Sequence, residues 1–369
     1  ASRFLIKASD LSHTVGVSYT IMATRCEAAL MQITQGKIHL ATQTIQKATQ
    51  LAGEKQIPTF GFKWYVLAEI ALEQNDLASA EKLLMDGINI SKQGVLIDDL
   101  RLELMTFAHL KKSMGDLTAA LAAIEQAHSI CQSLEIPRFV TLSNAHRVRI
   151  QLANGINEFA NKWAQEYQDL RNSHPVEYIR EYEDITLARV FYVNGDNDKA
   201  LELLTPLYEQ AKVEGRFRTC IEVAILLSLI NNAKVKTDLA IQWLSIAVKL
   251  AEPEGFLRLF LNEGTFISEL LPKVRQAAPR FVDKLLQAFS LQNTNQKTIF
   301  PANDKLISPL SEQELRVLKL IVLGKSNQEI AEELFISIGT AKWHVHNILQ
   351  KLGVNNRPQA IALAREMDI

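Results

Sequence analysis

An internal repeat with a period close to 40 residues runs from residue 1 to about residue 250 and constrains the fold more than any other feature of the sequence. Six reference positions lie 39 or 40 residues apart, and an alanine stands five positions after each of them. The reference positions are Gly36, Asn75, Gly115, Gly155, Gly195 and Val235, and the alanines are Ala41, Ala80, Ala120, Ala160, Ala200 and Ala240. A small residue lets two helices cross closely, and the apolar sides of each helical pair can be covered only by the next pair. The repeat therefore predicts an all-α superhelix of about six long helical hairpins.

The composition is that of a globular protein with more than one packed unit. The chain has 369 residues, of which 47% are hydrophobic and 22% are charged, and its net charge is −1. No run approaches the roughly 18 apolar residues of a membrane-spanning helix, and Ala1 to Asp10 lacks the apolar core of a signal peptide. We expect a cytoplasmic protein with no membrane partner. The chain begins without Met, which is consistent with a fragment of a longer protein.

The last part of the chain, Ser308 to Ile369, carries a second pattern, which predicts four short helices. The expected helices are Glu312–Leu323, Gln328–Leu334, Ile338–Leu352 and Arg357–Met367. Each start has a residue that can cap it: Ser311, Ser326, Ser337 and Asn356, three of them followed at the third position by Glu or Gln. The connection between the second and third helices is short enough to predict a tight helix-turn-helix.

The third of these helices has two distinct faces. At 100° per residue, an apolar stripe contains Ala341, Val345, Ile348 and Leu352. The opposite side contains Lys342, Trp343, His346 and Gln350. No Asp or Glu occurs from Leu334 to Arg365, so this side is suited to contact phosphate. A net charge of −1 argues against a general polyanion binder, but it allows positive charge confined to one small domain.

The same segment resembles the LuxR-type helix-turn-helix domain. The matching motifs are Leu310-Ser-x-x-Glu314, Gly324-x-Ser-Asn327, Glu329-Ile-Ala331, Leu334-x-Ile-Ser337, Gly339-Thr340-x-Lys342-x-His344, Asn347-Ile and Lys351-Leu-Gly-Val-x-x-Arg357. The resemblance implies a bacterial transcription regulator, whose third helix enters the major groove of double-stranded promoter DNA. It implies a fourth helix that helps to pair two subunits. Ala341 stands where the family usually has Val, and Trp343 is large for a position that faces bases, so the family's sequence preference is not transferred.

The resemblance assigns residues to two interfaces. We expect Lys342, Trp343 and His346 to face bases, and Thr340, Asn347 and Lys351 to lie nearer phosphates. With Gln350 from the polar face, the expected DNA-binding set is Thr340, Lys342, Trp343, His346, Asn347, Gln350 and Lys351. The expected dimerisation set is Gln359, Ala360 and Leu363, which can point away from the core of the domain. We expect a homodimer on DNA, and RNA polymerase is a candidate partner.

The repeat resembles the tetratricopeptide repeat, although its period exceeds the usual 34 residues by about six. Followed by a LuxR-type domain, it is more similar to the superhelical sensor domain of MalT-like regulators. Glu252 to Gly264 resembles the segment that closes this superhelix. We therefore predict a right-handed superhelix of long tetratricopeptide-like hairpins followed by a four-helix LuxR-type domain. The expected boundaries are 1–250 for the repeats, 251–290 for the closing segment, 291–307 for a polar linker and 308–369 for the DNA-binding domain.

The inner surface of the superhelix is the expected place for an effector. Polar and aromatic side chains in its middle provide the candidates Tyr65, Arg147, Arg149, Tyr178, Arg180, Tyr182 and Arg189. For any one of these residues a structural role is the simpler interpretation, whereas for the surface as a whole we favour binding. We expect a small-molecule or protein effector of unknown identity. The family resemblance favours an activator.

Enzymatic chemistry is not expected in this chain. The tripeptide Gly324-Lys325-Ser326 resembles the end of a phosphate-binding loop, but Lys319 stands where that motif needs Gly. The histidines and the three cysteines show no spacing that predicts a metal site. We expect no cofactor, and the resemblance implies that an ATPase module can precede such a chain. The alternative function is a protein-interaction scaffold, whose C-terminal bundle makes protein contacts.

Overall fold

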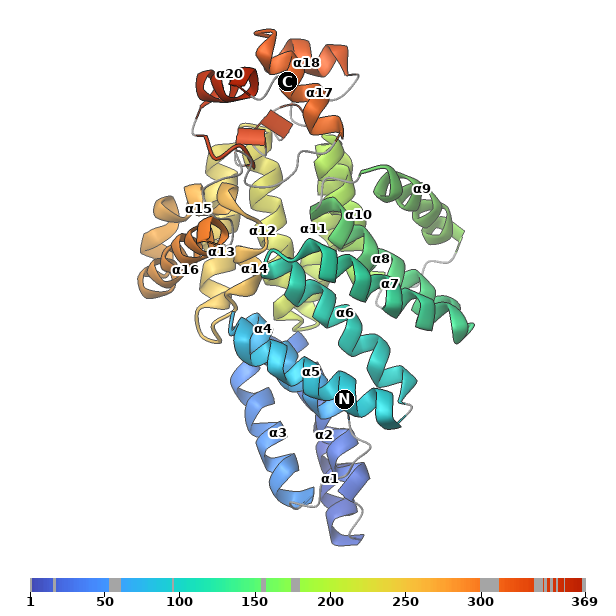
Figure 1. The fold of residues 1–369 in the computed structure, drawn as a ribbon. Helices are drawn as coiled ribbons and strands as arrows, with labels where there is room; N and C mark the ends of the chain where they lie inside the picture. Colours follow the sequence, from blue (N-terminus) through green and yellow to red (C-terminus); the bar gives the residue numbers. More distant parts are fainter. Residues whose placement is uncertain are drawn as a thin grey trace.

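The computed structural model is helical throughout the part of the chain that it describes (Figure 1). This part comprises residues 2–15, 18–52, 61–94, 96–153, 157–173, 180–298, 312–334, 341, 344, 345, 348, 349, 351–354 and 356–366. Within it there is no strand, and every helix is too short or too polar to span a bilayer. The all-α fold class predicted from the repeat is confirmed.

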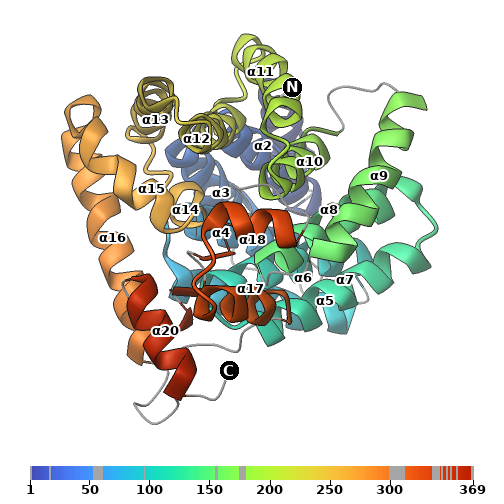
Figure 2. The ribbon, with the colours of Figure 1, turned by 90° about the horizontal axis from the view of Figure 1, so that it is seen from above.

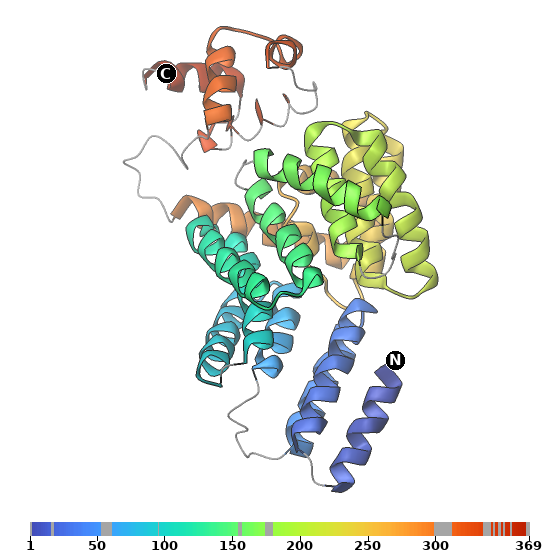
Figure 3. The same cartoon turned by 90° about the vertical axis from the view of Figure 1, so that its right-hand side faces the viewer.

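The repeat region is a series of helical hairpins, in which each even-numbered helix from α2 onward pairs with the next helix (Figures 1 and 3). Its helices are α1 (Ser2–Val15), α2 (Ser18–Thr34), α3 (Ile38–Ala52), α4 (Phe62–Glu73), α5 (Leu77–Gly94), α6 (Ile97–Ser113), α7 (Leu117–Ser133), α8 (Pro137–Ala153), α9 (Asn157–Ser173), α10 (Glu181–Asn194), α11 (Asn197–Val213), α12 (Phe217–Ala233) and α13 (Thr237–Ala251). The following segment contains α14 (Arg258–Leu261), α15 (Thr265–Leu270), the 3-10 helix η2 (Leu271–Ala277) and α16 (Pro279–Thr298). Helix α16 extends past residue 291, where we predicted the linker to begin.

The reference positions of the repeat are the turns between the two helices of each hairpin. Their φ angles are 72° at Gly36, 64° at Asn75, 87° at Gly115, 83° at Gly195 and 61° at Val235. This left-handed conformation ends the first helix, and the next residue donates its N–H back across the last turn. The N–H groups of Asp76 and Asp196, for example, reach carbonyl oxygens five residues earlier at 2.8 Å. Gly155, the remaining reference position, lies outside the described residues.

The repeated alanines lie where two helices meet. Ala41, Ala80, Ala120, Ala160, Ala200 and Ala240 all have an exposed fraction of 0%. A larger side chain at such a position would have to displace the neighbouring helix, because protein interiors are packed to crystal-like density. The structure confirms that the alanine spacing predicted from sequence marks the close contacts within the repeats.

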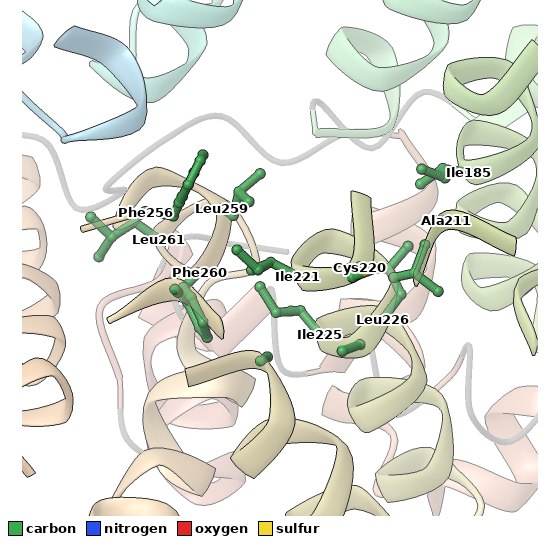
Figure 4. Packing of buried hydrophobic residues seen from close by; sticks show 14 of the residues in the cluster. Ile185, Ala211, Cys220, Ile221, Ile225, Leu226, Phe256, Leu259, Phe260 and Leu261 are labelled. Carbon is green, nitrogen blue, oxygen red and sulfur yellow. The ribbon is translucent and has the colours of Figure 1, made fainter. Parts of the chain in front are cut away.

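Helix α12 forms the centre of the largest hydrophobic core. Its residues from Thr219 to Asn231 are all buried, so the helix is covered on every side. Figure 4 shows Ile221 and Ile225 of α12 on the side of the 256–261 segment, and Cys220 and Leu226 on the side of Ala211. Such all-round burial requires an almost entirely apolar helix, which is what the sequence Ile221–Ile230 provides.

The first two hairpins meet the last one through the segment that follows α13. The backbone N–H of Leu257 donates to the carbonyl oxygen of Glu73 at 3.0 Å. Arg258 Nη1 donates to Asn75 Oδ1 at 2.8 Å, and the N–H of His39 donates to Glu254 Oε2 at 2.8 Å. Viewed from above, α14 lies close to α4 and α12 (Figure 2). Residues that are far apart in the sequence therefore join across the middle of the array.

The C-terminal helices have a hydrophobic core of their own. They are α17 (Glu312–Val322), α18 (Asn327–Glu333) and α20 (Arg357–Glu366), within one residue of the predicted helices at each end. Ser326 and Glu329 form the expected capping box at the start of α18. At the start of α20, Asn356 Oδ1 accepts the N–H of Gln359 at 3.0 Å. The predicted caps Ser311 and Ser337 lie outside the described residues.

Candidate nucleic-acid interface and inner polar cluster

The apolar stripe predicted for the third C-terminal helix faces the core of its domain. Ala341 and Ile348 are 0% exposed, Leu352 is 4% exposed and Val345 is 8% exposed. They pack with apolar residues of α17, α18 and α20. Six residues of the expected DNA-binding set lie outside the described residues, namely Thr340, Lys342, Trp343, His346, Asn347 and Gln350. Their contacts with DNA stay predictions.

Lys351, the seventh member of that set, has a partner inside the domain. Its Nζ lies 2.6 Å from Glu314 Oε2 of α17. The Glu314 side chain is only 2% exposed, whereas that of Lys351 is 24% exposed. A buried carboxylate needs a paired cation, so Lys351 ties the third helix to α17. The contact of Lys351 with phosphate stays a prediction, and the ion pair with Glu314 gives this residue a structural role as well.

A second polar anchor joins α20 to the turn before α18. Arg357 Nη1 donates to Asn327 Oδ1 at 3.1 Å, and its Nη2 donates to the carbonyl oxygen of Lys325. Burial lowers the pKa of Arg357. The LuxR-type motif ends at this arginine, and the structure supplies a physical reason for it: the guanidinium holds two helices of the small domain together.

The three residues expected to mediate dimerisation do not share one face. Gln359 is exposed and Leu363 is partly buried. Ala360 is 0% exposed and belongs to the domain core together with Ala364. The prediction that Ala360 points outward is wrong, because the small residues at i and i+4 form the inward stripe of α20. A dimer contact through this helix would therefore have to use Gln359 and its exposed neighbours.

The first helices of five hairpins, together with the segment after α13, bring charged and polar side chains together at the inner side of the array. We call these residues the inner polar cluster. They are Glu69, Glu73, Thr106, His109, Lys112, His146, Arg149, Tyr182, Arg189, Arg218, Glu222, Arg258 and Glu263. Such a cluster requires close pairing of charges, because unpaired buried charges are costly.

Glu222 of α12 is the main anion of the inner polar cluster. Its Oε1 lies 2.7 Å from Arg149 Nη1 and 3.1 Å from Arg189 Nη2, and Arg218 Nη1 lies 3.6 Å from its Oε2. Burial alone would raise the pKa of Glu222. The guanidiniums of Arg149, Arg189 and Arg218 outweigh burial and lower this pKa below its ordinary value of 4.5.

Two further ion pairs connect distant helices. Arg189 of α10 donates from Nη1 and Nη2 to the Glu263 carboxylate at 2.9 and 2.7 Å. Arg218 of α12 donates from Nε to Glu73 Oε1 of α4 at 2.6 Å. The first pair binds the segment after α14 to the fifth hairpin's first helix, and the second joins the second hairpin to the sixth. Both are well shielded from water, since their carboxylates are 8% and 4% exposed.

Two histidines and a tyrosine form an uncharged part of the inner polar cluster. His109 Nε2 lies 2.7 Å from His146 Nδ1, and Tyr182 Oη lies within 3.2 Å of both nitrogens. Burial lowers the pKa of His109 and lowers that of His146 to about 3. Both imidazoles are therefore neutral near pH 7. The sequence pattern gave no expectation that these histidines meet, because they stand 37 residues apart, three fewer than the repeat spacing of 40, and so do not occupy equivalent positions of the two repeats.

Three of the seven effector candidates belong to the inner polar cluster. Arg149, Tyr182 and Arg189 meet there, with the Arg149 guanidinium 3.7 Å from the Tyr182 ring centre. Tyr65 is partly buried and has a pKa raised by burial. Arg147 instead pairs with Glu125 at 2.8 Å, and Arg180 donates to the carbonyl oxygen of Leu170 at 3.2 Å. Tyr178 lies outside the described residues.

Sequence reasoning did not select Lys112, Arg218 or Glu222. The available signal was a spacing of 37 residues between polar side chains of successive first helices, three fewer than the repeat spacing of 40. Residue pairs separated by 37 positions, such as Glu69 and Thr106 or Arg149 and Thr186, are joined by hydrogen bonds in the structure. A search for polar residues at this spacing would have found such pairs, whereas the contacts of Arg149 with Glu222 and of Arg218 with Glu73 join residues 73 and 145 positions apart.

Comparison with known proteins gives two family matches. Residues 3–277 match the family model described as MalT-like TPR region, and residues 308–364 match the one described as bacterial regulatory proteins, luxR family. An HTH-type transcriptional regulator MalT from Serratia proteamaculans is 26% identical over 364 residues, and one from Yersinia pestis is 27% identical over 363 residues. Each alignment covers 91% of this chain and 39% of the relative, so the chain spans about two fifths of those proteins.

Proposed function

Because the chain belongs to the MalT-like TPR family and ends in a LuxR-family regulatory domain, we propose that it regulates transcription by binding promoter DNA. The observation that carries the proposal is the joining of two parts in one chain. A repeat array with its own core precedes a small domain with a separate core. In the third helix of this small domain the apolar stripe is buried, so the opposite, acid-free side would be the one to face DNA.

The proposed DNA contacts follow the residue set expected from sequence. Lys342, Trp343 and His346 would face bases, and Thr340, Asn347 and Lys351 would lie nearer phosphates. Lys351 can serve in both ways, because an ammonium has three donors and Glu314 accepts at 2.6 Å from only one of them. A single domain of this size makes few contacts, so two copies would bind adjacent half-sites.

Signal reception would fall to the repeat region. The inner polar cluster gathers residues from five hairpins and from the segment after α13, so a ligand there would touch elements that are far apart in the sequence. Binding at such a place can change how the repeats stack, which is the kind of two-state element that regulation needs. Activation rather than repression remains the prediction from the family resemblance, to be tested with a promoter–reporter fusion.

The test is DNA binding by matched variants of the full chain. DNA duplexes selected by the chain from a random pool serve as the probe, and affinity is measured by fluorescence anisotropy. Lys342→Ala is expected to weaken specific binding by about 1–3 kcal/mol, the range for one good base contact. Lys284→Ala removes an exposed positive charge from α16 and should bind like the parent. Equal affinities of the parent and Lys342→Ala, with unchanged helicity, would contradict the proposed docking.

Dimeric binding has a separate test. Duplexes carrying two half-sites roughly one helical turn apart should bind more tightly than duplexes whose spacing is changed by about five base pairs, because this change puts the second site on the opposite side of the duplex. If the full chain bound both duplexes equally, a symmetric pair of DNA-binding domains would not be the binding form.

A further inference from the structure

Glu103 of α6 is a buried acid that has no partner. It is 0% exposed, and neither of its carboxyl oxygens has a hydrogen bond with any residue that the structure describes. Helix α6 packs against both α4 and α5 (Figure 1), and each of them approaches this carboxyl with a glycine. A Cβ would lie 2.7 Å from Glu103 Oε1 if added to Gly61, before α4, and 2.6 Å if added to Gly87 of α5. The two glycines therefore leave the space that the carboxyl fills.

The array contains a matched acid that does have a partner. Glu183 of α10 stands two repeat lengths of 40 residues after Glu103, and it is likewise 0% exposed. Arg138 donates from Nη1 and Nη2 to the two carboxylate oxygens of Glu183. Two repeat lengths before Arg138 the sequence has Pro58, which carries no charge. A buried carboxylate needs a paired cation, and Glu103 lacks the one that its counterpart has.

No cation of the surrounding helices pairs with this carboxyl in the part of the chain that the structure describes. Arg101 of α6 pairs with Asp98 at 3.2 Å, and the ammonium of Lys63 on α4 lies 5.1 Å from the centre of the Trp64 ring. The other cations of α5 and α6 are exposed, are paired with Glu81 or belong to the inner polar cluster: Lys82, Lys92, Lys111 and Lys112. An ionised Glu103 would therefore be buried without a counter-charge.

These surroundings favour the neutral form of Glu103. Burial raises the pKa of Glu103 to about 7. The Ser91 hydroxyl of α5 offsets burial only in part, without a hydrogen bond of regular geometry, and the carboxyl of Asp99 raises this pKa further. Asp99 lies one turn earlier on α6 and accepts the backbone N–H of Phe62 at 3.1 Å. Near neutral pH the Glu103 carboxyl is thus divided between a form that suits its site and a form that does not.

We propose that Glu103 is a pH-dependent latch between the second and third hairpins, closed while its carboxyl is neutral and loosened when the carboxyl is ionised. An ionised carboxylate is stabilised by water, and water reaches this one only if α4 or α5 moves away from α6. The second hairpin also holds the segment after α13, because Glu73 and Asn75 bind Leu257 and Arg258. Loosening the latch would therefore change the closure of the whole array, independently of any contact with DNA.

Amide hydrogen exchange of the full chain from pH 5 to pH 8 tests the latch, with rates corrected for the intrinsic effect of pH. The pKa of buried Glu103 is raised above its ordinary 4.5, so the stability that its neutral form contributes is lost as the pH rises toward about 7. Openings that expose α5 and α6 should become roughly tenfold more frequent between pH 6 and pH 8, while α12 stays more protected. Corrected rates in α5 and α6 that ignore pH, or that equal those of α12, would overturn the proposal.

Glu103→Gln is the decisive variant, because glutamine has the shape of the neutral acid and does not ionise. It should exchange like the parent at pH 5 and more slowly than the parent at pH 8. The difference between the two proteins cancels other groups that titrate in this range, such as Lys112 with its pKa of about 8. Asp86→Asn changes an exposed acid of α5 and should keep the parent's response. A Glu103→Gln variant that keeps this response, or that exchanges faster than the parent at pH 8, would refute the assignment.

Asp99→Asn separates the two neighbouring acids of α6. The asparagine oxygen can still accept the Phe62 N–H, so the start of α4 keeps its hydrogen bond. Because this change removes a like charge near Glu103, the response should persist and should end at a somewhat lower pH. Loss of the response in Asp99→Asn together with its retention in Glu103→Gln would assign the latch to Asp99 instead.

Discussion

Val235 shows how the repeat tolerates a residue that is poorly suited to its position. It occupies the left-handed turn between α12 and α13 with φ 61°, where most repeats have Gly. The left-handed conformation costs an L-residue such as Val about 1–2 kcal/mol. Replacing it with Gly removes this strain, but part of the gain is lost because the unfolded chain has more conformational entropy with Gly. Val235→Gly is expected to raise the free energy of unfolding by about 1 kcal/mol in urea titrations. The control is the reverse change, Gly115→Val. A Cβ at this position would meet open space, so any loss of stability comes from the left-handed backbone conformation alone. A stabilised Gly115→Val would contradict this reading of the turns.

Glu222 is the single residue on which the inner polar cluster most depends. Glu222→Ala would leave the Arg149, Arg189 and Arg218 guanidiniums without their shared carboxylate, and removing one partner of a buried ion pair costs about 3–5 kcal/mol. Exposed Glu209→Ala is the matched control.

The pKa of Glu222 is lower in the folded state than its ordinary 4.5, so its stabilising contribution is complete above that pH and is lost as pH falls toward the folded value. Chemical denaturation from pH 7 to 3 should therefore narrow the gap between parent and variant, and a constant gap would count against this assignment.

At the scale of elements, the close crossing of helices within a hairpin depends on the repeated alanine. Ala120→Leu is expected to force α7 away from α6 and lower the free energy of unfolding by about 1–3 kcal/mol, as overpacking does. Thr118→Leu adds a similar side chain at an exposed site on the same helix and should have little effect. Equal melting temperatures for parent and Ala120→Leu would show that the helices can separate without cost.

The elements also show which inferences sequence supports and which it does not. Turns and crossings are local, so positions such as Gly195 and Ala200 could be identified by their spacing alone. Contacts such as Arg218 with Glu73 join residues 145 positions apart, and they arise from the curvature of the whole array. Ala360 was misplaced for a different reason. Helix α20 is short and rich in small apolar residues, so its inward side is not evident from residue type.

At the scale of the whole molecule, the contact between the first and last repeats limits what the turn at Gly36 can accept. A Cβ on Gly36 would lie 2.9 Å from Phe217 Cβ of α12, whereas one on Gly115, which has a similar φ, would meet nothing within 4 Å. Gly36→Ala is therefore expected to destabilise the chain by about 1–3 kcal/mol more than Gly115→Ala, because overpacking at the closure adds to the cost of the turn. Similar losses in urea titrations of the two variants would show that the array can open there without cost.

The central claim is that this chain binds DNA through its C-terminal domain, and the most direct test is the salt dependence of binding. The dissociation constant of the full chain for its selected duplexes is measured from about 50 to 200 mM salt and compared with that of residues 1–298, which retain the core of the repeat region. We predict that the full chain binds and weakens steeply with salt, as release of counterions requires, and that residues 1–298 do not bind. Equal binding by the two proteins, or binding by the full chain that is indifferent to salt, would contradict the account.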